Sequence, residues 1–191
     1  MIVTIHQPDF VPWYPLFKKI NSSDLFVILT QSQFEKNGRQ NRFFYNERWH
    51  TMSVNKGLES IYLKKYVNPE EDWYKIKENL KNKRSILDQY DAYVSSNLVK
   101  MNTDIIIKTM SLLDIKTDVD FDFTTNLKGT DRLVEICKSK GASTYLSGPS
   151  GSSYLDLEKF KDAGIKVEFF ESQDTEKIHT LDFLNNEISK N

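Results

Sequence analysis

The chain opens with Met1-Ile2-Val3-Thr4-Ile5-His6-Gln7-Pro8-Asp9-Phe10-Val11-Pro12-Trp13-Tyr14-Pro15. The short apolar run before His6 is rich in β-branched residues, which is typical of a buried strand. The prolines that follow end both strand and helix. His6, Gln7 and Asp9 are therefore predicted on a stiff loop at a strand end, where ligands of α/β sheets usually bind. The alternative is a proline-rich turn in which His6 and Gln7 only cap backbone groups.

The composition describes a globular domain without a strong charge bias. The chain has 191 residues, with 26 Lys and Arg against 27 Asp and Glu, so a substantial core can form and no nucleic-acid partner is favoured. No apolar run reaches the ~20 residues that span a bilayer. No basic segment precedes an apolar one as in a signal peptide. We expect one domain over residues 1–191, cytoplasmic and without a membrane span.

Apolar periodicity predicts an α/β fold, with a mixed or mostly parallel central sheet, flanking helices and a helical insertion. Strands are expected at residues 2–5, 25–29, 144–146 and 165–170, with a hairpin of 42–45 and 49–54 and a short strand at 61–63. Helices are expected at residues 17–20, 130–140, 156–163 and from 181 on. Thr130 or Asp131 is the expected N-cap of its helix. Pro69 and the acids after it predict the start of the helical insertion, residues 69–114.

Three groups of motifs lie along this framework. The first is Ile5-His6-Gln7-Pro8-Asp9-Phe10-Val11-Pro12-Trp13 with Ser23-Asp24-Leu25-Phe26-Val27. The second is Gln33-Phe34 with Gln40-Asn41-Arg42 and Trp49. The third is Leu133-Val134-Glu135-Ile136-Cys137, Tyr145-Leu146-Ser147-Gly148-Pro149 and Tyr154-Leu155. Together they resemble the WbqC-like protein family, although Thr30-Gln31-Ser32 stands where acidic residues are expected.

The resemblance implies a bacterial protein of polysaccharide or O-antigen biosynthesis. It suggests a sugar-modifying transferase that attaches an acyl or aminoacyl group to a nucleotide-linked amino sugar. The donor would be an activated carboxyl group, an acyl-carrier-protein thioester being one form of it. No cofactor is implied. The alternative is a non-catalytic subunit of a biosynthetic complex that binds the sugar or the carrier.

His6 is the candidate general base, because its ordinary pKa lets it take a proton from an attacking amine near neutral pH. Asp9 is the second candidate catalytic residue, since its carboxylate could orient the imidazole or bind an ammonium group. Gln7 completes this polar cluster as a substrate-binding residue. The alternative for His6 is a structural histidine that closes the strand end.

Gln33, Asn41 and Arg42 form a second candidate set for substrate binding. The planar fork of Arg42 matches a phosphate or carboxylate through two hydrogen bonds. Gln33 and Asn41 can both donate and accept, which suits sugar hydroxyl groups or an acyl oxygen. The alternative is that Asn41 and Arg42 only brace the start of a strand.

The small residues from Ser147 to Ser152 follow a predicted strand, so their amides could approach a ligand. Ser147, Gly148 and Tyr154 are therefore candidate substrate-binding residues. The segment lacks the Gly-Lys-Ser/Thr ending of a Walker loop and the spacing of a nucleophile elbow. The alternative is a tight left-handed turn with a structural role only.

The remaining reactive side chains give weaker signals. Cys137 is the single cysteine and falls on the apolar face of its predicted helix, where cysteine acts as a small hydrophobe. A nucleophilic role for it is the less favoured alternative. His6, His50 and His179 lack the short spacing of metal ligands, so we assign no metal.

Overall fold

The computed structural model describes residues 1–171 and 178–188. The chain forms two compact units, and each is built from separate stretches of sequence. The first unit contains Met1–His6, Pro15–Leu29 and, among the described residues, residues 115–171. The second contains Gln7–Tyr14, Thr30–Asp114 and the C-terminal helix. Because the chain passes repeatedly between the units, we propose that residues 1–191 fold as one interdependent domain.

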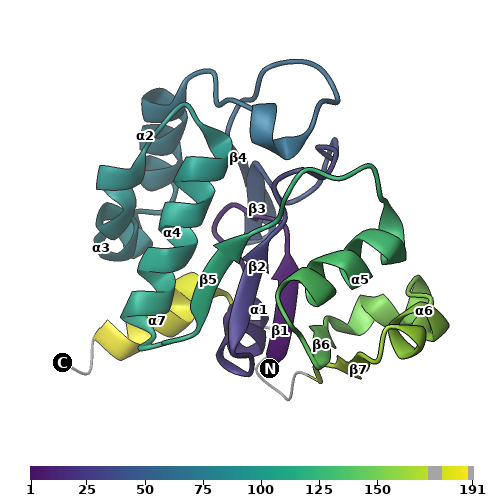
Figure 1. The fold of residues 1–191 in the computed structure, drawn as a ribbon. Helices are drawn as coiled ribbons and strands as arrows, with labels where there is room; N and C mark the ends of the chain where they lie inside the picture. The colour runs from purple at the N-terminus through teal and green to yellow at the C-terminus, as the bar shows by residue number, and fades with distance from the viewer. Residues whose placement is uncertain (172–177, 189–191) are drawn as a thin grey trace. The chain divides into compact units, whose positions relative to one another are not determined.

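The first unit contains a parallel sheet with the strand order β5-β2-β1-β6-β7 (Figure 1). Its strands are β1 (Ile2–His6), β2 (Leu25–Ile28), β5 (Asp118–Phe121), β6 (Thr144–Ser147) and β7 (Lys166–Phe169). Every pairing within it is parallel. The sequence-based expectation of an α/β fold with a mostly parallel sheet is confirmed.

Helices cover both faces of this sheet. They are α1 (Tyr14–Asn21), α5 (Gly129–Ser139) and α6 (Leu157–Asp162). Apolar side chains of α5 and α6 share one buried cluster with Val3 and Ile5 of β1. Helix α1 joins β1 to β2 in the opposite direction along the sheet, so the right-handed crossover rule places it on the other face (Figure 1).

The second unit is mostly helical. Its helices are α2 (Pro69–Asn79), α3 (Arg84–Leu87), α4 (Leu98–Leu112) and α7 (Thr180–Ile188). Short 3₁₀ turns form η1 (Ile61–Leu63), η2 (Lys81–Lys83) and η3 (Asp88–Tyr93). Helices α2, α3, α4 and α7 contribute to one apolar cluster that also contains Phe10 and Phe43. The expected helical insertion at residues 69–114 therefore supplies most of the core of this unit.

A tight hairpin carries the strands β3 (Arg42–Tyr45) and β4 (Arg48–Thr51). The expected hairpin is confirmed, with a two-residue turn of Asn46 and Glu47. Their φ angles are 49° and 60°, as the type I′ turn that matches strand twist requires.

Two local expectations were wrong, and one strand was not predicted. Residues 61–63 form η1 instead of a strand, because the amide of Lys64 turns back to the carbonyl of Ile61. Helix α5 has Lys128 at its N-cap, and the Thr130 hydroxyl accepts instead from the amide of Asp156 at 3.1 Å. Strand β5 was not predicted, because its alternating acidic residues give a partly exposed edge strand instead of an apolar run.

Candidate functional site

His6 and Gly148 follow neighbouring strands of the first unit. Strands β1 and β6 pair in parallel, so His6 at the end of β1 and Gly148 just after β6 share the carboxyl edge of the sheet. From β1 the chain moves to β2 on one side, whereas from β6 it moves to β7 on the other. This reversal is the place where open α/β sheets bind ligands. The predicted strands at residues 2–5 and 144–146 are thus direct neighbours in one sheet.

The segment after β6 is a 3₁₀ turn, η4 (Pro149–Ser153). The backbone of Gly148 is extended, with φ −70° and ψ 165°, so the expected alternative of a left-handed turn is not found there. The Ser147 side chain is buried, and a Cβ on Gly151 would lie 2.0 Å from its hydroxyl oxygen. Ser147 therefore packs under the turn. A Cβ added to Gly148 would meet no atom of the described residues within 4 Å, and Tyr154 is largely exposed.

A buried ion pair also lies at this edge, and the sequence did not point to it. Asp122 follows β5, and its carboxylate pairs with the guanidinium of Arg132 in α5. The Asp122 amide donates to the carbonyl of Ile28 at the end of β2, at 3.1 Å. Ile28 pairs with His6 in the sheet, so this ion pair lies next to the strand end that carries His6. Removing either partner would leave an uncompensated buried charge.

A buried amide network holds Gln7 in the second unit. The amide of Gln40 donates to Gln7 Oε1. The amide of Asn102 in α4 donates to the carbonyls of Pro8 and Gln40, both at 2.7 Å, and Tyr66 donates to Asn102 Oδ1 at 2.7 Å. These bonds rigidify the proline loop through partners that are far away in sequence. Asn102 and Tyr66 were not predicted, because nothing local marks them.

Gln7 and Gln33 line one pocket of about 580 Å³. The rest of its lining comes from Ser32, Phe34, Glu35, Lys36 and Leu58. Two carboxamides and a hydroxyl can each donate and accept hydrogen bonds, and Leu58 and Phe34 add apolar surface. This mixture suits a polyhydroxylated ligand better than a hydrocarbon or a multiply charged one.

A buried lysine supports the wall of this pocket. The segments 30–34 and 58–62 run antiparallel, with Phe34 N donating to Glu59 O at 2.9 Å. The Lys64 ammonium donates to the carbonyls of Asn55 and Gly57 at 2.8 and 2.7 Å, and it lies 4.8 Å from the ring centroid of Phe34. It also pairs with the Glu59 carboxylate at 3.3 Å. Lys64 therefore joins the 55–59 loop to Phe34, which lines the pocket.

The side chains of Asn41 and Arg42 make hydrogen bonds to backbone carbonyls of the second unit. The Asn41 side chain is buried and donates to the carbonyl of Met52 at 2.7 Å. The Arg42 guanidinium donates to the carbonyls of Asn37 and Gly38 and lies 4.0 Å from the ring centroid of Trp49. These contacts fit the bracing role that the sequence left open, and the ligand roles of both residues stay predictions.

The predicted site residues divide between the two units. His6, Ser147, Gly148 and Tyr154 belong to the first unit, and Gln7, Asp9, Gln33, Asn41 and Arg42 to the second. The structure brings His6 and Gly148 to one sheet edge and Gln7 and Gln33 to one pocket. Asp9 is buried, and its amide donates to the carbonyl of Gln7 at 2.9 Å.

The reactive side chains that the sequence analysis did not favour as site residues are mostly buried. Cys137 is buried in the core of the first unit, which raises the pKa of its thiol to about 12. His50 and His179 lie in the second unit and both pack against Phe43. Over residues 1–171 and 178–188, no group of three His, Cys, Asp or Glu side chains is placed to hold a metal ion.

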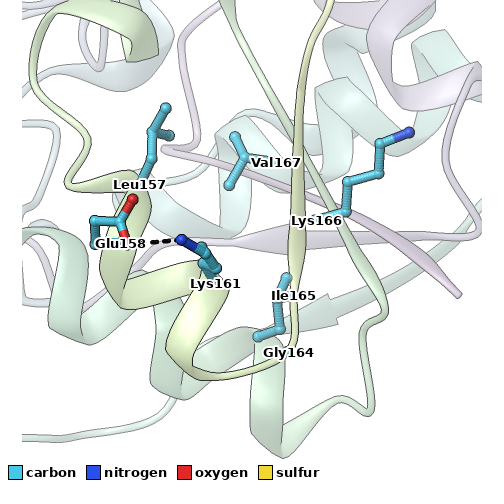
Figure 2. A pocket seen from close by; sticks show the side chains of 7 residues that line it. All are labelled: Leu157, Glu158, Lys161, Gly164, Ile165, Lys166 and Val167. Carbon is cyan, nitrogen blue, oxygen red and sulfur yellow. Dashed lines mark hydrogen bonds and ion pairs between the residues drawn. The ribbon is translucent and has the colours of Figure 1, made fainter.

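A second pocket, of about 410 Å³, lies between α6 and the start of β7 (Figure 2). Its charged side chains are already paired: Lys161 with Glu158 at 3.2 Å, and Lys166 with Glu168 at 2.7 Å. It lies at the amino end of the strand, away from the carboxyl edge that carries His6. The Gln7–Gln33 pocket is therefore the stronger candidate.

A sequence model of the WbqC-like protein family matches residues 7–182. The chain belongs to this family. The matched range contains the proline loop, the Gln33 and Gln40 segments and the residues after β6, so the resemblance inferred from the motifs is confirmed.

One curated relative is "Uncharacterized protein Rv1507c" of Mycobacterium tuberculosis. It is 27% identical over 193 residues, which cover 88% of this chain and 81% of the relative. Among solved structures, the zinc-bound form of a variant of AdcAII from Streptococcus pneumoniae covers 99% of this chain and 96% of its own. Its sequence identity is 12% and its TM-score is 0.25, too low to support an argument about fold or metal binding. No helix of the described residues is long and apolar enough to cross a membrane.

Proposed function

We propose that this WbqC-like protein is a cytoplasmic sugar-modifying transferase of bacterial polysaccharide or O-antigen biosynthesis. Its substrate would be a nucleotide-linked amino sugar, and it would transfer an acyl or aminoacyl group to the amine of that sugar. The observation that carries the proposal is the pocket in which Gln7, Gln33 and Ser32 lie together. Side chains that both donate and accept are the ones that match sugar hydroxyl groups.

The reaction needs a base, and His6 is proposed for that role. The sugar amine would attack the carbonyl carbon of a thioester donor, such as that of an acyl carrier protein. A C–N bond forms, the C–S bond breaks, and the thiolate leaves. His6 would accept the proton that the amine loses and pass it to the thiolate. Backbone amides after Gly148 are proposed to stabilise the oxygen that gains negative charge, and Asp9 to orient the imidazole or the amine.

The test is mass spectrometry of nucleotide-linked amino sugars incubated with the protein and an acyl-thioester donor. Wild-type protein should add the mass of one acyl group. His6→Ala should abolish turnover while its affinity for the nucleotide-linked sugar stays within about twofold. Gln33→Ala should instead weaken affinity by about tenfold, the effect of losing a hydrogen bond or two. Tyr62→Phe, on an exposed residue of the same unit, is the matched control.

The second candidate function is a non-catalytic subunit that binds the sugar or the carrier. It is favoured by the pocket lining, because none of the side chains that line it is an imidazole or a thiol. Unchanged turnover in His6→Ala would remove the catalytic role of His6. Binding without turnover in wild-type protein, across a panel of acyl and aminoacyl donors, would support the second candidate.

A further inference from the structure

Two N–H donors of the second unit are buried with no acceptor. Trp13 Nε1 and His179 Nε2 are each shielded from solvent, and no acceptor within residues 1–171 and 178–188 reaches either nitrogen. His179 is only 6% exposed. Burying a donor without an acceptor is expensive, so a pair of such donors calls for an explanation.

The hydrogen bonds of His179 define which ring nitrogen is the donor. His179 directly precedes α7, and its Nδ1 accepts from the amide of Leu181 at 3.2 Å. An accepting Nδ1 carries no proton, so in the neutral ring the proton sits on Nε2. Burial lowers the pKa of His179 to about 4, which keeps the ring neutral at ordinary pH. His179 Nε2 is therefore an N–H donor, as the Trp13 indole always is.

Trp13 and His179 flank the same contact. The Thr180 hydroxyl, next to His179, donates to the carbonyl of Pro12, next to Trp13. The Arg39 guanidinium carbon lies 4.5 Å from the centroid of the Trp13 ring. The charge of Arg39 also contributes, after burial, to lowering the pKa of His179. Two buried donors and one cation thus gather where the proline loop meets the start of α7.

The charged groups around them are already engaged. The Asp182 carboxylate accepts from Tyr45 Oη at 2.6 Å and from Lys83 Nζ at 2.7 Å. Tyr45 and Phe43 cover the His179 ring, with centroids 4.9 and 5.5 Å away. The nearest carboxylate is therefore held by other donors, and aromatic rings shield the imidazole from water.

We propose that Trp13, Arg39 and His179 form a binding site for an oxyanion, a carboxylate or a phosphate group. All three side chains offer N–H donors and, with His179 Nδ1 already engaged, none offers a free acceptor. Indole and guanidinium donors on a low-dielectric wall favour a negatively charged oxygen. The proposal stands on these donors and does not depend on the proposed transferase activity.

The experiment is NMR of ¹⁵N-labelled full-length protein, titrated separately with acetate and inorganic phosphate against chloride at matched ionic strength. The Trp13 Nε1–H and His179 Nε2 signals should shift saturably with an oxyanion and not with chloride. The indole of Trp49, which lies under Arg42, should stay unmoved. Preference for phosphate would indicate a phosphoryl ligand, and preference for acetate a carboxylate ligand.

Three conservative variants test the donors one by one. Trp13→Phe keeps an aromatic ring for Arg39 and loses the N–H together with part of the ring area. His179→Asn keeps an acceptor for the Leu181 amide and loses the Nε2–H. Arg39→Gln removes the charge from an exposed side chain, so folding should be preserved.

Each variant should weaken anion binding by about tenfold or more, the usual effect of losing one charge-assisted hydrogen bond. Trp49→Phe and Arg48→Gln are the matched controls and should bind like wild type. The proposal is overturned if neither anion gives a saturable shift in the wild-type protein. It is also overturned if Arg39→Gln, with an unchanged melting curve, binds as tightly as wild type.

Discussion

His179 should make the free energy of unfolding fall as the solution is acidified. Its folded pKa is lowered to about 4, mainly by burial, against an ordinary value of 6.5. The unfolded chain therefore binds more protons than the folded one between these values, so stability is full above pH 6.5 and is lost as the pH falls toward 4. With these two pKa values, His179 alone should cost about 2 kcal/mol on going from about pH 7 to about pH 5.

Two other titrating groups near His179, Asp182 and His50, also contribute to the pH dependence of stability. The pKa of Asp182 is lowered by its bonds to Lys83 and Tyr45, which outweigh its burial, so its contribution is lost only below about pH 4. The pKa of His50 is lowered by burial, and its contribution adds with the same sign.

The assay is urea unfolding of wild type and His179→Asn at about pH 7, 6 and 5. Asparagine is a good N-cap, so the variant retains an acceptor for the Leu181 amide and loses only the titrating ring. The loss of stability on acidification should be smaller in the variant by about 2 kcal/mol, whatever its stability at neutral pH. His50→Asn controls for the second histidine. Parallel stability curves for wild type and His179→Asn would refute the argument.

Four further outcomes are expected. Cys137→Ala should cost about 1 kcal/mol, and the native thiol, buried with its pKa raised to about 12, should resist a thiol reagent; rapid labelling of folded protein would contradict this. Glu47→Gly should stabilise the hairpin by about 0.5–1 kcal/mol in urea unfolding, because its φ is 60°; a loss of stability would argue against the turn. Lys64→Met should lower the free energy of unfolding by about 1–3 kcal/mol, because it leaves buried carbonyls without a donor. It should also weaken sugar binding. Wild-type affinity in the folded variant would show that Lys64 does not support the pocket. Gly148→Val should leave the melting temperature within a few degrees of wild type, since the added Cβ would meet no atom of the described residues within 4 Å. It should weaken ligand binding. A large fall in melting temperature with unchanged ligand affinity would show that the loop has a structural role only.

The local sequence pattern predicted much of the first unit. Apolar runs placed β1 and β2, and the pattern of apolar and capping residues placed α5 and α6, because period and propensity are properties of neighbouring residues. Strand β5 was not predicted, because an edge strand buries little apolar surface and needs no apolar run of residues. Residues 61–63 were assigned to the wrong structure because their conformation depends on hydrogen bonds to Ser32 and Thr30, which lie far back in the chain.

The site was predictable only in part, for the same reason. The proline loop and the end of β1 indicate His6 and Gln7 as site candidates from sequence alone, since prolines stop a strand wherever it lies. The side-chain contacts of Asn41 and Arg42 depend on Met52 and the turn around Gly38, so the sequence could not show which partners these two side chains have.

The sequence by itself determined the α/β character of this protein, its family and the polar loop after the first strand. Only the tertiary structure decided that Gln7 is held by Gln40 and that Trp13 and His179 flank one hydrogen bond. Such pairs join residues far apart along the chain, and hydrophobic periodicity carries no information about which distant polar groups will meet. Their pairing follows from the packing of the core, because burial removes these groups from water and leaves only other buried groups as hydrogen-bond partners.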